Sequence, residues 1–181
     1  VAALEARRDD HPLGLAEALN RLGCRLIEQL KLQEAEDVLK RALALREAAL
    51  GDHALTASTL NNLAVVLCHQ SRLADARVLM ERALSIAEKL YGPDHAEFAA
   101  RLQNLAALDH ASGRDREARP GFERALAIRE QVFGADDEKT VSTLAEMSIC
   151  LRDLGDCAGA QKALERAIEV RSRRLGADDP E

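Results

Sequence analysis

Residues 81–95 read ERALSIAEKLYGPDH, and close copies of this stretch recur along the chain at a nearly constant spacing. The copies read KRALALREAALGDH at 40–53, ERALAIREQVFGADD at 123–137 and ERAIEVRSRRLGADD at 165–179. Their glycines stand 41, 42 and 42 residues apart, at Gly51, Gly92, Gly134 and Gly176. A fixed period of this length indicates a protein built from repeated structural units.

A second motif lies upstream of each glycine and keeps the same period. It reads ALNRLG at 18–23, TLNNLA at 59–64, RLQNLA at 101–106 and TLAEMS at 143–148. In the second copy, four residues follow the i, i+3, i+4, i+7 spacing of one apolar helix face: Leu60, Leu63, Ala64 and Leu67. The motif therefore predicts that each repeat begins with an amphipathic helix.

A second helix follows in each repeat after a short break, at 70–72, 112–114 and 154–156. Gly92 is expected to end this helix in the second copy, because glycine readily adopts the left-handed conformation beyond a helix C-terminus. An aspartate lies just past three of the glycines, where its carboxylate is expected to cap the following helix. These aspartates are Asp52, Asp94 and Asp136.

The helix pair resembles the tetratricopeptide repeat, whose pattern is Leu-x-x-Leu-Ala, then a small residue such as Ala76, then an alanine such as Ala83. The usual period is about 34 residues. The LNNLA and RALAIRE-x-x-x-G motifs resemble the longer, 42-residue subclass of kinesin light chains and many bacterial regulators. Pro120 falls where that subclass often carries a proline. The resemblance implies an all-α, right-handed superhelical solenoid of antiparallel helix pairs, with four repeats and partial helices at both ends.

The repeats divide the chain into a single array over residues 1–181. The expected repeats are approximately 9–50, 51–91, 92–133 and 134–175. Residues 1–8 resemble the end of a preceding helix, and residues 176–181 resemble the start of a following repeat. Because the sequence opens at Val1 without methionine, we expect it to be one segment of a longer protein.

Asn61 and Asn62 suggest the location of a binding surface. At about 100° per residue, both lie almost opposite the apolar face of their helix. The resemblance implies that this side of each first helix lines the concave groove of the superhelix. An amide offers both a donor and an acceptor, which suits the backbone of a bound peptide. The predicted groove residues are Asn20, Arg21, Ser58, Asn61, Asn62, Val65, His69, Gln103, Asn104, His110 and Glu146. The alternative is that the asparagines simply tolerate solvent on an exposed helix face.

The kind of ligand can be narrowed by comparison with the family. Repeats that bind C-terminal carboxylates use a Lys/Asn/Asn/Lys/Arg set, whereas the aligned positions here are Asn20, Cys24, Asn62, Ala100 and Asn104. Only Asn62 matches, which argues against a carboxylate clamp. The resemblance to kinesin light chains implies a short linear peptide held through its main chain, with Arg21 and Glu146 near opposite ends of the groove.

Composition excludes several other functions. The chain of 181 residues carries a net charge of −6 and has 2% aromatic residues, without the basic stripe of a nucleic-acid-binding protein. No apolar run reaches the roughly 18 residues of a membrane span, and no secretory segment is found, so we expect a soluble, cytoplasmic protein. The four cysteines lack a CxxC pair and are expected to be reduced and packed as small apolar residues.

No motif indicates catalysis, a cofactor or a metal site. Three histidines recur at the repeat period in successive loops, and we expect them to cap or pack there: His11, His53 and His95. Four arginines recur in the second helices and are expected to form ion pairs within or between repeats: Arg41, Arg82, Arg124 and Arg166.

We therefore expect a non-enzymatic scaffold that binds a protein or a linear peptide. Three alternatives stay open. The array could be the regulatory arm of a larger multidomain signalling protein, such as an ATPase or protease. It could be an oligomerisation module that self-associates through its outer face or its ends. A nucleic-acid-binding helical repeat is the least favoured, given the negative charge.

Overall fold

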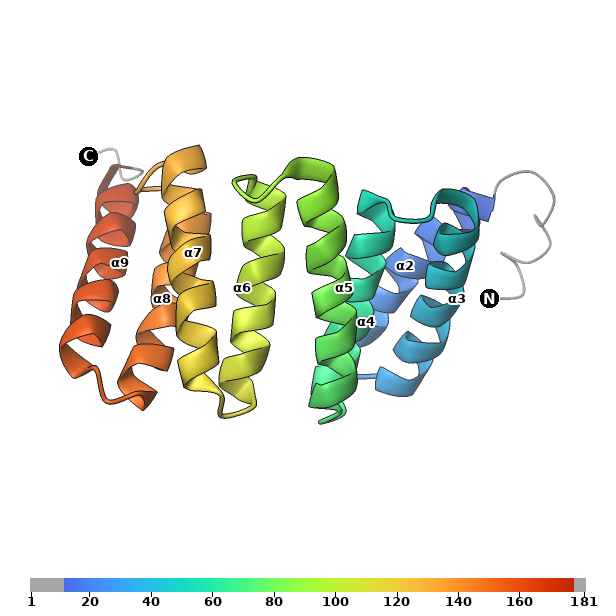
Figure 1. The fold of residues 1–181 in the computed structure, drawn as a ribbon, viewed down its shortest axis with the longest axis horizontal. Coiled ribbons are helices and arrows are strands. Elements are labelled where there is room, and N and C mark those ends of the chain that lie inside the picture. The colour runs from blue at the N-terminus through green and yellow to red at the C-terminus, as the bar shows by residue number, and fades with distance from the viewer. Residues whose placement is uncertain (1–11, 178–181) are drawn as a thin grey trace. The chain divides into compact units, whose positions relative to one another are not determined.

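The computed structural model describes residues 12–177, and eight α-helices occupy this range in sequential antiparallel pairs (Figure 1). The helices are α2 (Pro12–Glu28), α3 (Leu32–Leu50), α4 (Ala54–His69), α5 (Leu73–Tyr91), α6 (Ala96–Ala111), α7 (Asp115–Phe133), α8 (Glu138–Asp153) and α9 (Cys157–Ala177). The predicted all-α array of helix pairs is confirmed. The expected helix tail at 1–8 lies outside the described residues, as do residues 178–181 of the expected following repeat.

The helices form two compact units, one ending at Leu90 and the other beginning at Tyr91. Unit 1 contains α2 to α5, and its core includes the predicted apolar face of α4. On that face Leu60 and Ala64 are fully buried, and Leu63 and Leu67 are nearly so. Leu39 of α3 packs with Leu63 in one apolar cluster, so the second helix of one pair is covered by the first helix of the next.

Unit 2 contains α6 to α9 and repeats this packing. Phe122 of α7 is 1% exposed and packs in one cluster with Val141 and Leu144 of α8. Small residues let the helices approach, since a Cβ added at Gly121 would lie 2.9 Å from the Cβ of Ala106. The helix α7 continues through Pro120, which is exposed.

The predicted breaks between paired helices are confirmed at 70–72, 112–114 and 154–156, and an equivalent turn joins α2 to α3. Gly92 has a φ of +85° and lies directly after α5, as expected for the residue that ends the helix. Gly176, at the equivalent place in the fourth copy, instead lies within α9.

The predicted helix caps are wrong by one residue. The residues that cap α4, α6 and α8 are His53, His95 and Asp137, each accepting a backbone N–H two residues further on. The side chain of the capping residue must directly precede the helix to reach those N–H groups. The three aspartates one position earlier form ion pairs instead. These pairs are Asp52–Lys89, Asp94–Arg124 and Asp136–Arg173.

The side-chain contacts also test the expectations for the recurring histidines and arginines. The capping role is confirmed for His53 and His95, while His11 lies outside the described residues. The recurring arginines do form ion pairs in three repeats: Arg82–Glu47, Arg124–Asp94 and Arg166–Glu130. All four cysteines are free thiols, but Cys157 is exposed, so the expected packing as a small apolar residue is wrong at that position. Within residues 12–177, no helix is both long enough and apolar enough to cross a membrane.

Candidate peptide-binding surface

In unit 1, the predicted groove residues lie on one side of α2 and α4, which we call the first-helix face of unit 1. Arg21 and His69 are exposed, and the others are half-buried: Asn20, Ser58, Asn61, Asn62 and Val65. They alternate with the fully buried residues of the apolar face, because an α-helix turns by about 100° per residue. The helix therefore presents these side chains away from its core.

The asparagines of this face contact each other across the two helices. The side-chain amide of Asn62 donates to the Oδ1 of Asn20 at 3.2 Å and lies 3.4 Å from the Sγ of Cys24. Such a hydrogen bond contributes about 1 kcal/mol net. Asn62 therefore joins the first helices of successive pairs, which is a structural role beside any contact with a ligand. Arg21 pairs with Glu17 on its own helix.

In unit 2, the equivalent contact is made by Gln103 of α6 and Glu146 of α8. The Gln103 amide donates to the Oε1 of Glu146 at 2.6 Å, and its carbonyl accepts from the hydroxyl of Thr143 at 3.3 Å. Gln103 is 6% exposed, so little of it could reach a bound peptide. Gln103 is therefore buried beneath this surface, and Asn104 and Glu146 beside it are half-buried.

A shallow polar pocket of about 360 Å³ opens on this side of unit 2. It is lined by Gln103, Asn104, Arg129, Glu138, Lys139 and Ser142. The lining offers amide, guanidinium, ammonium, hydroxyl and carboxylate groups within one depression. This set can donate and accept hydrogen bonds at the same time, as the backbone of an extended peptide requires.

Four residues of this pocket were missed by sequence reasoning, namely Arg129, Glu138, Lys139 and Ser142, and Arg129 is buried among them. Its NH1 donates to the carbonyl oxygen of Lys139 at 2.7 Å and to the hydroxyl of Thr143 at 2.8 Å. Burial of the Arg129 guanidinium lowers its pKa. The same contacts recur in unit 1, where Arg46 donates to the carbonyl of Leu55 at 2.8 Å. A signal was present in the sequence, because RALALR and RALAIR end on these two arginines.

His110 lies in the last turn of α6, about two turns after Gln103, and does not line the polar pocket. Its Nδ1 is 2.5 Å from the Oδ1 of Asp115, and its Nε2 is 4.0 Å from the Oδ2 of Asp153. Of the predicted groove residues of unit 2, Gln103 and Asn104 therefore line the polar pocket, Glu146 adjoins it through Gln103, and His110 lies apart from it.

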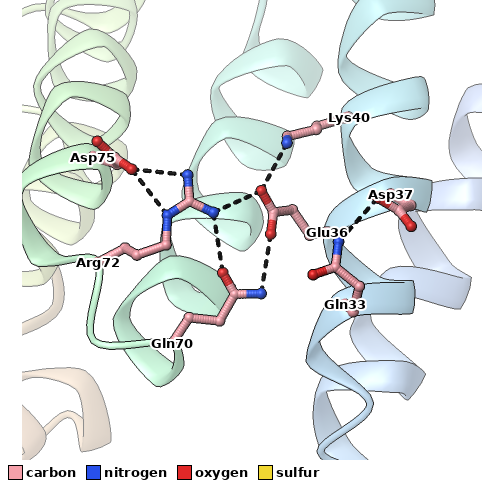
Figure 2. Close-up of polar contacts among 7 residues, drawn as sticks. All are labelled: Gln33, Glu36, Asp37, Lys40, Gln70, Arg72 and Asp75. Carbon is pink, nitrogen blue, oxygen red and sulfur yellow. Dashed lines mark hydrogen bonds and ion pairs between the residues drawn. The ribbon is translucent and has the colours of Figure 1, made fainter.

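A separate polar cluster joins the helix pairs of unit 1 and is centred on Glu36 of α3 (Figure 2). The Glu36 carboxylate is 3% exposed and lies 2.7 Å from Lys40 Nζ and 2.9 Å from Arg72 NH1. The Gln70 amide donates to its other oxygen at 3.0 Å. The hydrogen bond with Lys40, followed by those with Gln70 and Arg72, lowers the pKa of Glu36 to about 2.

Comparison with known protein families agrees with this repeated geometry. Models described as tetratricopeptide repeat match residues 15–54, 55–120 and 98–173. The chain therefore belongs to the tetratricopeptide-repeat family, whose members are generally protein-interaction modules and typically non-catalytic. A search of curated proteins gave no match.

Several solved structures share the fold. The putative kinesin light chain repeats of Podosopora anserina superpose with a TM-score of 0.80 at 19% identity, covering 96% of this chain and 82% of that one. BtubC (BKLC) from P. vanneervenii gives a TM-score of 0.84 at 23% identity, covering 96% and 69%. A Rap protein complexed with competence and sporulation factor gives 0.80 at 18% identity, covering 90% and 44%. The predicted resemblance to kinesin-light-chain-like repeats is thereby confirmed for the fold.

Proposed function

We propose that the chain is a protein-interaction scaffold that binds a peptide or a partner segment along the first helices of its repeats. The observation that carries this proposal is the polar pocket of unit 2, in which Asn104, Ser142 and Lys139 present donors and acceptors together. The first-helix face of unit 1 adds half-buried amides of the same type. A peptide bound on either of these surfaces would form several hydrogen bonds of about 1 kcal/mol each with the polar groups of that surface.

The chemistry of the pocket favours a peptide backbone over a charged end group. The lining holds the cations Arg129 and Lys139 together with the carboxylate of Glu138, and Glu146 lies next to it through its hydrogen bond with Gln103, so charges of both signs are present. Support by analogy comes from the Rap neighbour, which was solved in complex with competence and sporulation factor. A linear segment that is polar and extended is the ligand we expect, bound in the cytoplasm without a cofactor, nucleic acid or membrane.

The experiment is a displayed peptide library selected on the intact chain, followed by binding measurements with variants. Asn104→Leu and Ser142→Leu each remove polar groups of the pocket, and we expect each to weaken a selected peptide about tenfold, since a single hydrogen bond to a buried group contributes roughly 1–1.5 kcal/mol. Gln131→Leu, on the exposed surface of α7, is the matched control. Peptides that bind all three variants as well as the original chain would show that the pocket is not the site.

Self-association is the second candidate, because one apolar surface on α8 and α9 favours it. Ile149, Leu164 and Ile168 are 44%, 46% and 55% exposed, and a pocket of about 340 Å³ lies among the first two and their neighbours. The occupant we propose is the same surface of a second copy. Light scattering at several concentrations should then show a dimer that Leu164→Glu abolishes. A monomer at every concentration would reject this candidate.

A further inference from the structure

The end of α6, the start of α7 and the facing part of α8 bring together side chains with three different donor atoms. The imidazole of His110, the carboxylate of Asp115 and the thiol of Cys150 each place one atom within 4.8 Å of the others. Among the described residues, no other group of three or more such side chains is gathered in this way. The sequence hides the cluster, because Cys150 is 35 residues from Asp115 and comes from the next helix pair.

We propose that His110, Asp115 and Cys150 form a binding site for a divalent transition-metal ion. One nitrogen, one sulfur and one oxygen donor suit Zn²⁺, which accepts all three kinds of ligand and can take water at the fourth position of its tetrahedron. Mg²⁺ and Ca²⁺ are disfavoured, because they bind oxygen donors almost exclusively. This site lies apart from the polar pocket and does not depend on the proposed peptide binding.

The spacing of the donors fits a metal ion after small side-chain rotations. Ligand distances of about 2.0–2.3 Å place tetrahedral donors roughly 3.3–3.8 Å apart. In the structure, His110 Nδ1 and Asp115 Oδ1 are closer than this, at 2.5 Å, and all three donor atoms lie within 4.8 Å of one another. The Cys150 Sγ lies 3.5 Å from the carbonyl oxygen of Asp115. Moderate changes of side-chain torsion would equalise these distances.

The surrounding charge also favours a cation. The carboxylates of Asp115 and Asp153 create a negative electrostatic field around the Cys150 thiol. The same field attracts a positive ion. When the ion binds, the thiol loses its proton to solvent and the thiolate becomes a ligand. Arg119 is a nearby cation that weakens this negative field, but its own charge is partly offset by its ion pair with Glu123.

The turn between α6 and α7 does not require the contact between His110 and Asp115. The backbone N–H of Arg114 already donates to the carbonyl of Asp109 at 2.8 Å, and the Arg114 guanidinium binds the Asp109 carboxylate at 2.9 Å. Access is available as well, since the side chains of His110 and Asp115 are 26% and 20% exposed. A metal site thus explains a cluster that turn formation leaves unexplained.

The test is titration of the purified, metal-free chain with Co²⁺, followed by competition with Zn²⁺. A thiolate bound to Co²⁺ gives a near-ultraviolet charge-transfer absorption, and we expect it to saturate at one ion per chain and to disappear when Zn²⁺ is added. Asp115→Asn should weaken Co²⁺ binding about tenfold or more, and Cys150→Ser should remove the charge-transfer band. Cys157→Ser is the control, because that cysteine is exposed and outside the cluster.

Circular dichroism of each variant separates loss of the site from loss of the fold. If Cys150→Ser is misfolded, the test uses His110→Gln and Asp115→Asn instead. Both residues are partly exposed, so these changes remove ligands that contribute little to the core. A charge-transfer band that is unchanged in these two folded variants would overturn the proposal. So would the absence of any band in the original chain, or a band that Cys157→Ser abolishes.

Discussion

The carboxylate of Glu36 lies 2.9 Å from the guanidinium of Arg72, and the equivalent positions of unit 2 hold the same contact with its charges exchanged. There Arg119 of α7 lies 3.5 Å from the carboxylate of Asp156, which directly precedes α9 as Arg72 precedes α5. The neighbour one turn further on is exchanged as well. Lys40 binds Glu36, whereas Glu123 binds Arg119.

This exchange shows what the repeat conserves at this junction. Each unit joins the second helix of one pair to the turn of the next through an acid–base contact, but the sign of the charge is not fixed by the fold. Opposite charges attract equally in either order, so the geometry specifies complementarity rather than particular residues. Repeats that match in backbone and core can therefore differ in their surface charge.

The depressed pKa of Glu36 predicts a defined loss of stability in acid. Its pKa is about 2 in the folded chain against a reference value of 4.5, so its contribution is fully present above pH 4.5 and is lost as the pH falls from 4.5 to about 2. A shift of this size corresponds to at most about 3 kcal/mol. We expect Glu36→Gln to be less stable than the original chain at pH 7 in urea unfolding.

The difference between the two chains should then shrink at pH 3, because Glu36 is mostly protonated in the unfolded chain at that pH but is still mostly ionised in the folded chain, so folding already loses part of the stabilisation. Comparing the two chains at each pH cancels the titration of the other carboxylates. A difference that stays constant from pH 7 to pH 3 would contradict the assigned role of the Glu36 charge.

The exchanged charges make a second prediction that can be tested in unit 1 alone. Glu36→Arg by itself places a guanidinium beside Lys40 and Arg72 and should destabilise the chain by about 3 kcal/mol, because it breaks a buried pair and adds like charges. The triple variant Glu36→Arg, Lys40→Glu, Arg72→Asp copies the arrangement of unit 2. We expect it to recover at least half of the lost free energy of unfolding in urea.

The matched control is Glu36→Arg combined with Lys40→Glu alone, which leaves Arg72 facing the new arginine. If this double variant is as stable as the triple variant, the contact between the second helix and the next turn contributes nothing, and only the pairing within the helix matters.

Much of the fold could be predicted from the sequence, because the period of 41–42 residues and the apolar spacing depend on backbone geometry that every copy shares. The predicted helix caps were one residue too early. In the copies that lead into α4 and α6 an aspartate directly precedes a histidine, and the general preference for aspartate at the N-cap favours the aspartate. His53 occupies the capping position because it directly precedes α4, which leaves Asp52 to pair with Lys89.

The candidate site could be predicted only in part. Helical rotation correctly placed Asn62 outside the core. It could not show that the Asn62 amide donates a hydrogen bond to Asn20, which is the equivalent of Asn61 in the preceding repeat. Gln103 was expected to contact a ligand for the same reason, yet Glu146 and Thr143 take up its amide. Contacts between helices depend on their separation and tilt, which a single sequence does not specify. Whether these residues bind a peptide stays a prediction.

The close approach of α2 and α3 predicts a strong effect of a single methyl group. A Cβ added at Gly23 would lie 2.5 Å from the Cγ of Leu39, so Gly23→Ala must displace a fully buried side chain. We expect a loss of about 1–3 kcal/mol in denaturant unfolding, typical of overpacking. Gly14→Ala, on the exposed side of α2, is the control and should be neutral or slightly stabilising.

A double variant tests the assigned cause of that loss. Leu39→Ala makes room for the new methyl group, so Gly23→Ala should cost much less in the Leu39→Ala background than in the original chain. Equal costs in the two backgrounds would show that the strain comes from somewhere other than this contact.

Two residues at equivalent positions of successive second helices should lose very different amounts of stability on truncation to alanine. Phe122 of α7 is 1% exposed because α8 covers it, whereas Leu164 of α9 is 46% exposed. We expect Phe122→Ala to lower the free energy of unfolding by about 3–5 kcal/mol, as is typical for a buried aromatic side chain. Leu164→Ala should change it by about 0.5 kcal/mol or less, as is usual for exposed positions. Thermal unfolding of both variants at low and high protein concentration would check the contrast. A cost for Leu164→Ala that grows with concentration would mean that a second copy covers this surface, while a large cost at every concentration would mean that Leu164 is buried within the chain itself.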